Sequence, residues 1–187
     1  VKDTYDKRLV EFAPEEAVTL CQRMISSASE VDKRVLPAFG GTEVSVQEMV
    51  CANTSGVEGR DIGTSFSCAL GTMARSETQV SPVCFEFKAS RLYWPEPEWV
   101  GQEAARLAVE SIKVGEAKEG KFPILLHQFA LQSILMFTLI PSIRGDMVSR
   151  GRSIFRNRIG ESVADENISI YDDGTLPGGL ASGSTDM

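Results

Sequence analysis

The sequence predicts an α+β fold: an antiparallel β-meander with flanking helices, followed by a strand-helix-helix-strand segment. Apolar residues recur every three or four positions near residues 17–31 and 100–112, which is the spacing of amphipathic helices. Between residues 42 and 92 the spacing falls to two, the period of half-buried strands. Strands grouped in one run, with helices before and after, favour α+β over a doubly wound sheet.

Length and composition agree with an ordinary globular protein. The chain has 187 residues, of which 42% are hydrophobic and 24% charged, so a packed core is expected. A net charge of -7 argues against a general affinity for nucleic acid or anionic membranes. We predict a single α+β domain over residues 1–177 and a flexible end over residues 178–187, where small polar residues dominate.

The first predicted helix begins at Pro14 and ends near Arg34. Proline suits a first helical position, and Glu15 and Glu16 complement the helix dipole there. Pro37 follows the apolar stripe and is expected to stop the helix.

Three strands are expected between residues 42 and 92. Val44 and Val46 share one face, and the pattern slips near residues 47–48, as a bulge would produce. Residues 53–61 contain two glycines and predict a turn. The next two runs alternate, with one face made of Ile62, Phe66, Cys68 and Leu70 and another of Val83, Phe85, Phe87 and Ala89. Short turns between such runs favour a meander with one face on a core.

A second helix is expected from Pro97, and the segment from Lys121 to Gly179 follows it. This segment predicts a short apolar strand before His127, a long apolar helix, a basic helix and a strand at residues 168–171. No charged residue lies between Lys121 and Arg144, so we expect most of this stretch to be buried. Two prolines and several polar side chains within it argue against a membrane span. Without a signal-peptide pattern at Val1, a cytoplasmic location is expected.

The four cysteines, at positions 21, 51, 68 and 84, form no C-x-x-C pair. Neither a zinc knuckle nor a thioredoxin-type site is therefore indicated, and reduced core residues are expected.

Few residues suggest chemistry by themselves. The chain contains no G-x-G-x-x-G, P-loop or G-x-S-x-G pattern. His127 is the only histidine, which excludes sites built from several histidines within this chain. A core or helix-start histidine bonded to a backbone group is the favoured interpretation. Asp172 and Asp173 before Gly174 predict a turn, with a metal-binding role as the weaker alternative.

A basic cluster lies in the segment after Arg144. It consists of Arg144, Arg150, Arg152, Arg156 and Arg158, with Asp146 among them. A solvated helix face is the first interpretation, and an anionic partner is the second, because the whole chain is acidic.

Several motifs in this segment, in order, resemble the TldD/PmbA family of metalloproteases, often labelled modulators of DNA gyrase. The strand and His127 resemble the entry to the family's H-E-x-x-x-H motif, and the runs 151–155 and 159–164 resemble the segment after it. IYDDGTLPGG resembles the family's most recognisable loop, through Asp172, Asp173, Gly174, Pro177 and Gly178. The chain resembles the middle of a longer family member, with the N-terminal portion and the C-terminal domain expected outside it.

The motif itself is degenerate in this chain. The resemblance implies two metal-binding histidines and a glutamate that acts as general base, but only His127 is kept. Gln128 stands at the position of the base, and a neutral amide cannot accept a proton from water near neutral pH. Gln132 stands at the second ligand and is a poorer donor for zinc.

These departures resemble the PmbA-like or TldE-like branch. The resemblance implies a non-catalytic subunit that works with a TldD-like catalytic subunit, or as a homodimer, on flexible peptides. It implies no cofactor on this chain and zinc on the catalytic partner. Two alternatives stay open: an active metallopeptidase whose divergent site is completed by regions outside this chain, and a non-proteolytic binding module for an anionic or protein partner.

Overall fold

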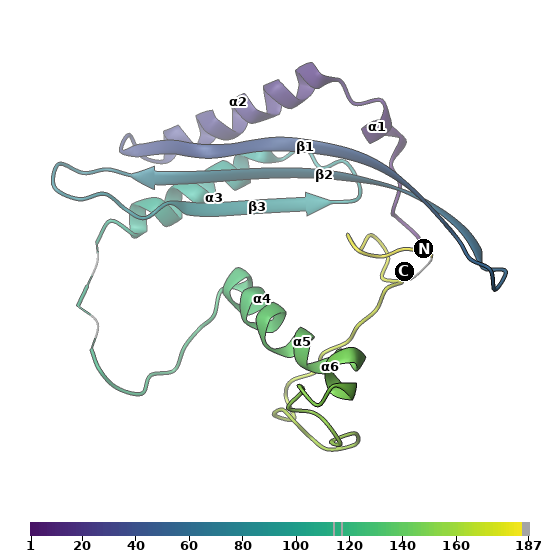
Figure 1. The fold of residues 1–187 in the computed structure, drawn as a ribbon. Coiled ribbons are helices and arrows are strands. Elements are labelled where there is room, and N and C mark those ends of the chain that lie inside the picture. Colours follow the sequence, from purple (N-terminus) through teal and green to yellow (C-terminus); the bar gives the residue numbers. More distant parts are fainter. Residues whose placement is uncertain (114, 117, 185–187) are drawn as a thin grey trace. The chain divides into compact units, whose positions relative to one another are not determined.

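The computed structural model describes residues 1–113, 115–116 and 118–184, and the chain divides into two compact units. Unit 1 comprises Val1–Gly115 and Asp172–Met187, and unit 2 comprises Glu116–Tyr171. Unit 1 holds α1 (Lys7–Val10), α2 (Pro14–Val31), β1 (Val35–Ala52), β2 (Glu58–Ala74), β3 (Cys84–Ser90) and α3 (Pro97–Glu110) (Figure 1). Unit 2 holds α4 (Gln128–Phe137), α5 (Leu139–Ile143) and α6 (Gly145–Ser149).

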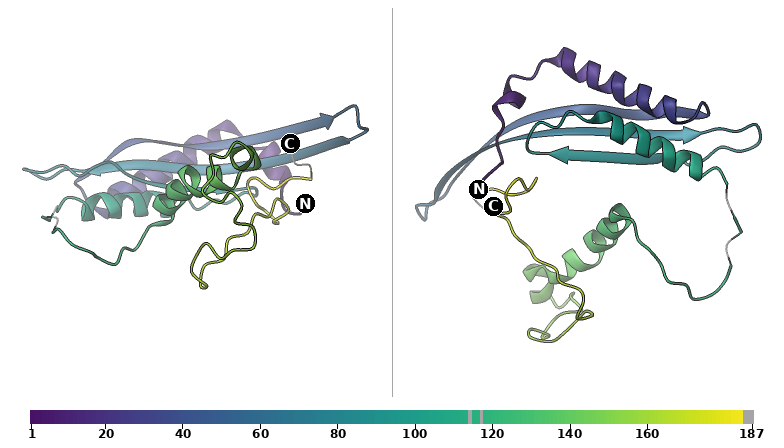
Figure 2. Two further views of the ribbon diagram at one scale, coloured as in Figure 1. Left: turned by 60° about the horizontal axis from the view of Figure 1, so that its bottom comes forward. Right: turned by 180° about the vertical axis from the view of Figure 1, so that it is seen from behind.

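The three strands form one antiparallel sheet in the order β1-β2-β3, so the α+β class and the meander are confirmed. β1 pairs with β2 along its whole length, whereas β3 pairs only with residues 66–72 of β2. Residues 45–52 and 58–65 therefore continue past β3 as a two-stranded ribbon, which we call the distal ribbon (Figure 2). A turn at residues 53–57 closes it, with the Asn53 carboxamide oxygen accepting from the amides of Ser55 and Val57.

The predicted bulge at residues 47–48 is wrong. Pairing is continuous there, and the register shifts instead between Pro37 and Phe39. Along residues 45–52 of β1 the side chains are exposed or half-buried, with none buried, so no buried face imposes an alternating pattern there. Proline near the shift fits this placement, since it has no N–H to donate to a ladder.

The core of unit 1 lies between the sheet and the two long helices, α2 and α3. Both helices begin with a proline at the first helical positions, as predicted. They pack on the sheet face formed by even-numbered residues of β2, which confirms the predicted alternation. The fully buried side chains include Leu20 and Met24 from α2, Phe66, Cys68 and Leu70 from β2, and Val100 and Ala104 from α3. The helices approach closely at Gly101, where an added Cβ would collide with the Met24 carbonyl oxygen.

β3 presents its charged side to the helices and its aromatic side outward. Glu86 is 2% exposed, and its carboxylate accepts from the Phe87 amide at 2.9 Å. On the opposite face Phe85 stacks on Phe39, with 5.9 Å between ring centroids. The helices therefore cover only one face of the sheet.

Unit 2 departs further from the sequence prediction. Residues 121–126 and 168–171, predicted as strands, carry no strand pairing, because the described part of unit 2 contains no strand to supply hydrogen bonds. The long helix breaks at Thr138, whose φ and ψ are -120° and -63°. The basic helix is reduced to α6, followed by turns.

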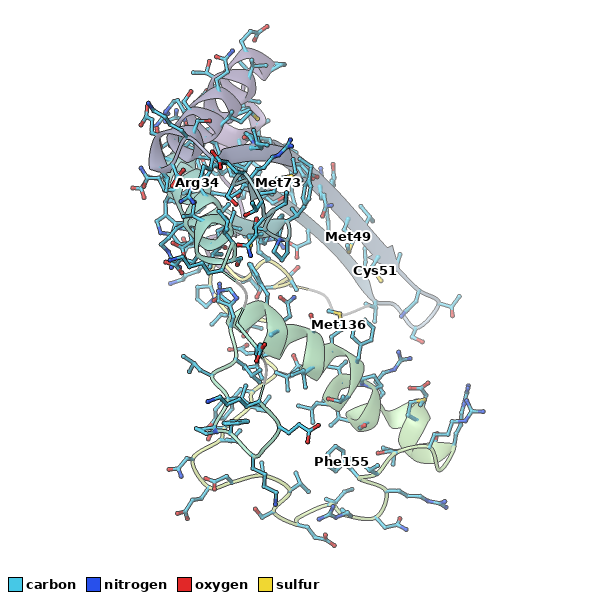
Figure 3. All side chains as sticks on the ribbon, turned by 90° about the vertical axis from the view of Figure 1, so that its left-hand side faces the viewer. Arg34, Met49, Cys51, Met73, Met136 and Phe155 are labelled. Carbon is cyan, nitrogen blue, oxygen red and sulfur yellow. The ribbon has the colours of Figure 1, made fainter. Side chains whose placement is uncertain are left out.

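The predicted burial of the uncharged stretch in unit 2 is also wrong for this chain. None of the residues of α4, α5 and α6 is buried. Figure 3 labels Met136 on α4, which is 48% exposed, and Phe155 after α6, which is half-buried. Of the described helices, none is both long and apolar enough to cross a membrane.

After unit 2 the chain returns to unit 1. The Gly178 amide donates to the Lys2 carbonyl at 3.0 Å, and the Ser184 amide donates to the Asp61 carboxylate at 2.6 Å. The predicted flexible end thus has hydrogen-bonded backbone at Gly178 and Ser184, and residues 185–187 lie outside the described residues. That residues 1–177 form a single domain stays a prediction.

Candidate functional site

The motif residues lie at the start of α4. His127 is the N-cap: its backbone is extended, with φ -63° and ψ 149°, and its Nδ1 accepts a long hydrogen bond of 3.4 Å from the Phe129 amide. Its ring also meets the Phe129 ring edge-on, with 5.1 Å between centroids. Of the two predicted roles, the helix start is confirmed and the core position is wrong, since His127 is exposed.

The cap affects what the imidazole can bind. A ring that accepts at Nδ1 carries its neutral-state proton on Nε2, so neither nitrogen then has a free lone pair for a metal ion. His127 can therefore cap α4 or ligate through either nitrogen in its neutral form, but not both at once.

Gln128 and Gln132 are exposed side chains on the first turns of α4. Both are neutral amides with weak oxygen donors, whereas zinc sites are built from imidazole, thiolate and carboxylate groups. Within the described ranges no three His, Cys, Asp or Glu residues lie close enough to hold a metal ion. His127, Gln128 and Gln132 by themselves do not fit a zinc site.

The loop with the second group of predicted residues belongs to unit 1. The Asp173 carboxylate accepts from the Thr175 hydroxyl at 2.7 Å and from its amide at 2.9 Å. These hydrogen bonds lower the pKa of Asp173. The Gly174 carbonyl accepts from the Gly183 amide at 3.1 Å, which draws the two ends of residues 174–183 together. Asp172 is exposed and precedes this turn, and the hydrogen bonds of Asp173 give the predicted turn geometry.

The end of this loop needs a positive φ. Gly178 has φ +67°, a conformation that glycine adopts without strain, and Pro177 precedes it. Residues 172–176 and 179–184 line a cavity of about 760 Å³. Pro177 and Gly178 lie between the two lining segments and do not themselves line the cavity.

Two residues that sequence reasoning missed hold this loop in place. The Arg91 guanidinium donates to the carbonyls of Gly179 at 3.2 Å and Ser182 at 3.3 Å. The hydrogen bond from the Ser184 amide lowers the pKa of Asp61. These partners are far apart in the chain, and no motif surrounds either Arg91 or Asp61, so the sequence offered no signal for them.

The arginine cluster of unit 2 is partly neutralised. Arg144 pairs with Asp146 at 3.0 Å, and Arg158 pairs with Glu161 at 2.7 Å. Arg152 instead lines a cavity of about 350 Å³ together with aromatic and aliphatic side chains. This arrangement favours the solvated-face interpretation over a concentrated anion-binding surface.

The structure therefore places the predicted residues in two settings. His127, Gln128 and Gln132 belong to unit 2, whereas the loop from Asp172 to Gly178 belongs to unit 1. Each group has a local structural role, as a helix start or as a turn.

Comparison with known proteins identifies related protein families. Residues 7–112 match the PmbA/TldA metallopeptidase central domain, and residues 119–187 match the PmbA/TldA metallopeptidase C-terminal domain. The prediction that the C-terminal domain lies wholly outside this chain is therefore wrong, because its model matches residues from 119 onward.

Related sequences extend well beyond this chain. Protein MJ0231 of Methanocaldococcus jannaschii is 32% identical over 156 residues, which cover 83% of this chain and 36% of the relative. The metalloprotease TldD homologue of Buchnera aphidicola (subsp. Acyrthosiphon pisum) is 27% identical over 178 residues, covering 88% and 36%. The chain thus spans 36% of the length of these two relatives.

Two solved structures share the fold. A Thermotoga maritima protein described as a modulator of a DNA gyrase superposes with a TM-score of 0.88 and 25% identity, covering 100% of this chain and 43% of that one. TldE from Thermococcus kodakarensis has a TM-score of 0.75 and 23% identity, covering 86% and 36%, and supports the fold alone. With the central-domain match over residues 7–112, these findings show that the chain belongs to the TldD/PmbA metallopeptidase family.

Proposed function

We propose that this chain is part of a non-catalytic subunit of a TldD/PmbA-type metalloprotease complex that degrades or processes flexible peptides. The observation that carries the proposal is the pair of glutamines at the motif positions, Gln128 and Gln132. A peptidase of this type needs a base that accepts a proton from metal-bound water, and a carboxamide cannot do so near neutral pH.

The local structure supports the same reading. His127 is the one retained ligand position, and its Nδ1 is occupied in capping α4. Any zinc chemistry would then come from a TldD-like partner subunit, which carries the intact motif. Relatives named as TldD and TldE are consistent with such an arrangement. A homodimer is the alternative assembly, and we place the complex in the cytoplasm.

Metal content tests this proposal. The protein is purified without its partner and without added metal, and zinc is measured per chain for the parent and for His127→Ala. We expect both proteins to hold far less than one zinc per chain. Stoichiometric zinc in the parent that is lost in His127→Ala would overturn the proposal in favour of an active peptidase with a divergent site.

Activity of the reconstituted complex gives a second readout. With a TldD-like subunit and an unstructured peptide, we expect His127→Ala to retain activity within about twofold, because the residue would not touch the reacting atoms. The matched control is loss of the motif glutamate in the partner, which should abolish hydrolysis. A comparable loss from His127→Ala would contradict the proposal.

A further inference from the structure

The outer edge of β1 is an unusual feature of unit 1. β1 is the first strand in the order β1-β2-β3, so among the described residues no strand lies on the other side of its backbone. Edge strands present a row of N–H and C=O groups that can pair with another chain, and most proteins shield them.

The direction of these backbone groups follows from the turn that closes the distal ribbon. The Asn53 amide donates to the Val57 carbonyl at 3.0 Å, so the backbone of residue 53 points toward β2. The pairing of β1 with β2 is continuous from residue 39 to residue 52. Along an antiparallel strand, the backbone N–H and C=O groups of successive residues point alternately to one side and to the other. Odd-numbered residues of β1 therefore point to β2, and even-numbered residues point outward.

β2 gives an independent check of this alternation. The amide of its even-numbered residue Thr64, which points away from β1, donates to the Thr4 carbonyl at 3.0 Å. The outward groups of β1 between residues 42 and 52 belong to Thr42, Val44, Val46, Glu48, Val50 and Ala52. None of these backbone groups has a hydrogen-bond partner on that side among the residues that the structure describes.

This part of the edge also lacks the usual protection. The near end of β1 contains Pro37 and the register shift, but residues 42–52 contain no proline, lysine, arginine or bulge. Glu43 and Glu48 are the charged side chains of that stretch, and Glu48 is neutralised by an ion pair with Arg60 of β2. Charge therefore does little to keep another strand away.

The side chains of the distal ribbon are apolar and exposed. Val46, Met49 and Val50 are 46%, 44% and 65% exposed, and Ile62 on β2 is 42% exposed. Met49 and Cys51 lie along the projecting ribbon in Figure 3. A two-stranded ribbon is marginally stable in water by itself, so a further strand would stabilise this one.

We propose that residues 42–52 of β1 pair antiparallel with the same residues of a second copy, about a two-fold axis through Gln47. An outward row of alternating donors and acceptors is complementary to another extended backbone. The two-fold register uses the whole unprotected edge. It places Val44 opposite Val50, Val46 opposite Glu48 and Glu43 opposite Cys51, so no two like charges face each other.

The central pair is also self-complementary. Gln47 meets its own copy, and a carboxamide can both donate to and accept from a second carboxamide. Such an isologous interface closes a dimer, since the same segment serves both copies. The pairing does not depend on whether the chain is catalytic, so its failure leaves the proposed function untouched.

A designed disulfide tests the register. Residue 47 forms a non-hydrogen-bonded pair with its copy, for which Cα atoms lie about 4.5 Å apart, within reach of a disulfide. In a Cys51→Ser background we expect Gln47→Cys to give a covalent dimer on mild oxidation, reversed by reductant. The matched control is Ser45→Cys, whose side chain shares the same face but lies opposite Met49 and should stay largely monomeric. Equal yields from the two variants, as association through unit 2 would give, contradict the proposal.

A second pair of variants tests the edge itself. Val46→Pro removes an outward N–H without touching the bonds to β2, and proline is tolerated on the open side of an edge strand. Each dimer loses two hydrogen bonds, so we expect its dissociation constant to rise at least about tenfold in light scattering, with unchanged circular dichroism. Val46→Thr keeps the N–H and should keep the dimer. A parent protein that is monomeric at tens of micromolar, or a Val46→Pro dimer of parental affinity, would overturn the proposal.

Discussion

Unit 1 and unit 2 differ in the burial of their apolar side chains. In unit 1 the stripes of α2 and α3 meet the sheet and become a buried cluster. In unit 2 the apolar helices α4 and α5 contain no buried residue. Two phenylalanines show the contrast: Phe66 of β2 is 1% exposed, whereas Phe137 of α4 is 80% exposed.

The difference teaches what a hydrophobic pattern can predict. α2 and α3 are amphipathic, so each needs cover on one side only, and the sheet supplies it. The stretch between Lys121 and Arg144 carries no charge on any side, so a helix formed there needs cover all around. The uncharged sequence therefore predicts a buried helix, but the described residues of unit 2 do not bury α4 or α5.

Truncating the two phenylalanines tests this difference in burial most directly. We expect Phe66→Ala to lower the free energy of unfolding of unit 1 by about 3–5 kcal/mol, because it leaves a cavity beside Phe12 and Tyr93. Phe137→Ala should change stability by less than about 0.5 kcal/mol, since an exposed side chain loses little packing. Urea denaturation followed by circular dichroism measures both. Equal losses would mean that α4 is covered in solution.

Alanine substitutions at two glycines, one in each unit, should give smaller changes in stability. In Gly101→Ala the new Cβ would meet the Met24 carbonyl and the Ser27 hydroxyl, so we expect a loss of about 1–3 kcal/mol as α2 and α3 move apart. In Gly145→Ala the Cβ meets no atom within 4 Å, and alanine should stabilise α6 by up to about 1 kcal/mol. Opposite signs in thermal unfolding are the expected result. A neutral Gly101→Ala would refute close packing of α2 on α3.

Two aspartates, half-buried Asp32 and exposed Asp165, give the smallest effect. The hydrogen-bonded ion pair with Arg34 lowers the pKa of Asp32 in unit 1 to about 2. Because the folded pKa lies below the ordinary value of 3.8, its stabilising contribution is present above about pH 4 and is lost as pH falls toward 2. In unit 2 the Asn167 amide and side chain lower the pKa of Asp165 without a cation.

Carboxyl titration by NMR measures this difference. We expect Arg34→Gln to return the pKa of Asp32 toward its ordinary value and to leave Asp165 unchanged. Added salt should raise the pKa of Asp32 more than that of Asp165, since salt screens charges more than neutral hydrogen bonds. An unmoved Asp32 in Arg34→Gln would contradict the assignment of its pKa to this pair.

Much of unit 1 could be predicted from the sequence because its signals are local. Pro14 and Pro97 mark both long helices, and the alternation around Phe66 gives the buried face of β2. The alternation in β3 did not reveal which side is buried, because Glu86 faces the helices and Phe85 faces outward. The strands predicted in unit 2 failed because a strand requires a partner that local pattern does not identify.

The candidate site shows the same limit. The role of His127 at a helix start and the turn at Asp173 followed from local residue preferences. The family assignment followed from motifs in order along the chain. Arg91 and Asp61 could not be predicted, since the residues they hold lie 91 and 123 positions away from them in the sequence.

That separation has a consequence for the order of events during synthesis. The strands and helices of unit 1 are complete once Glu110 has been made, but residues 178–184, which bind Lys2, Arg91 and Asp61, emerge only after all of unit 2. A ribosome therefore releases the sheet and its helices before the segment that ties the chain back to them. Until that moment Arg91 lacks the Gly179 and Ser182 carbonyls, and the nascent unit 1 has to persist with this corner solvated by water.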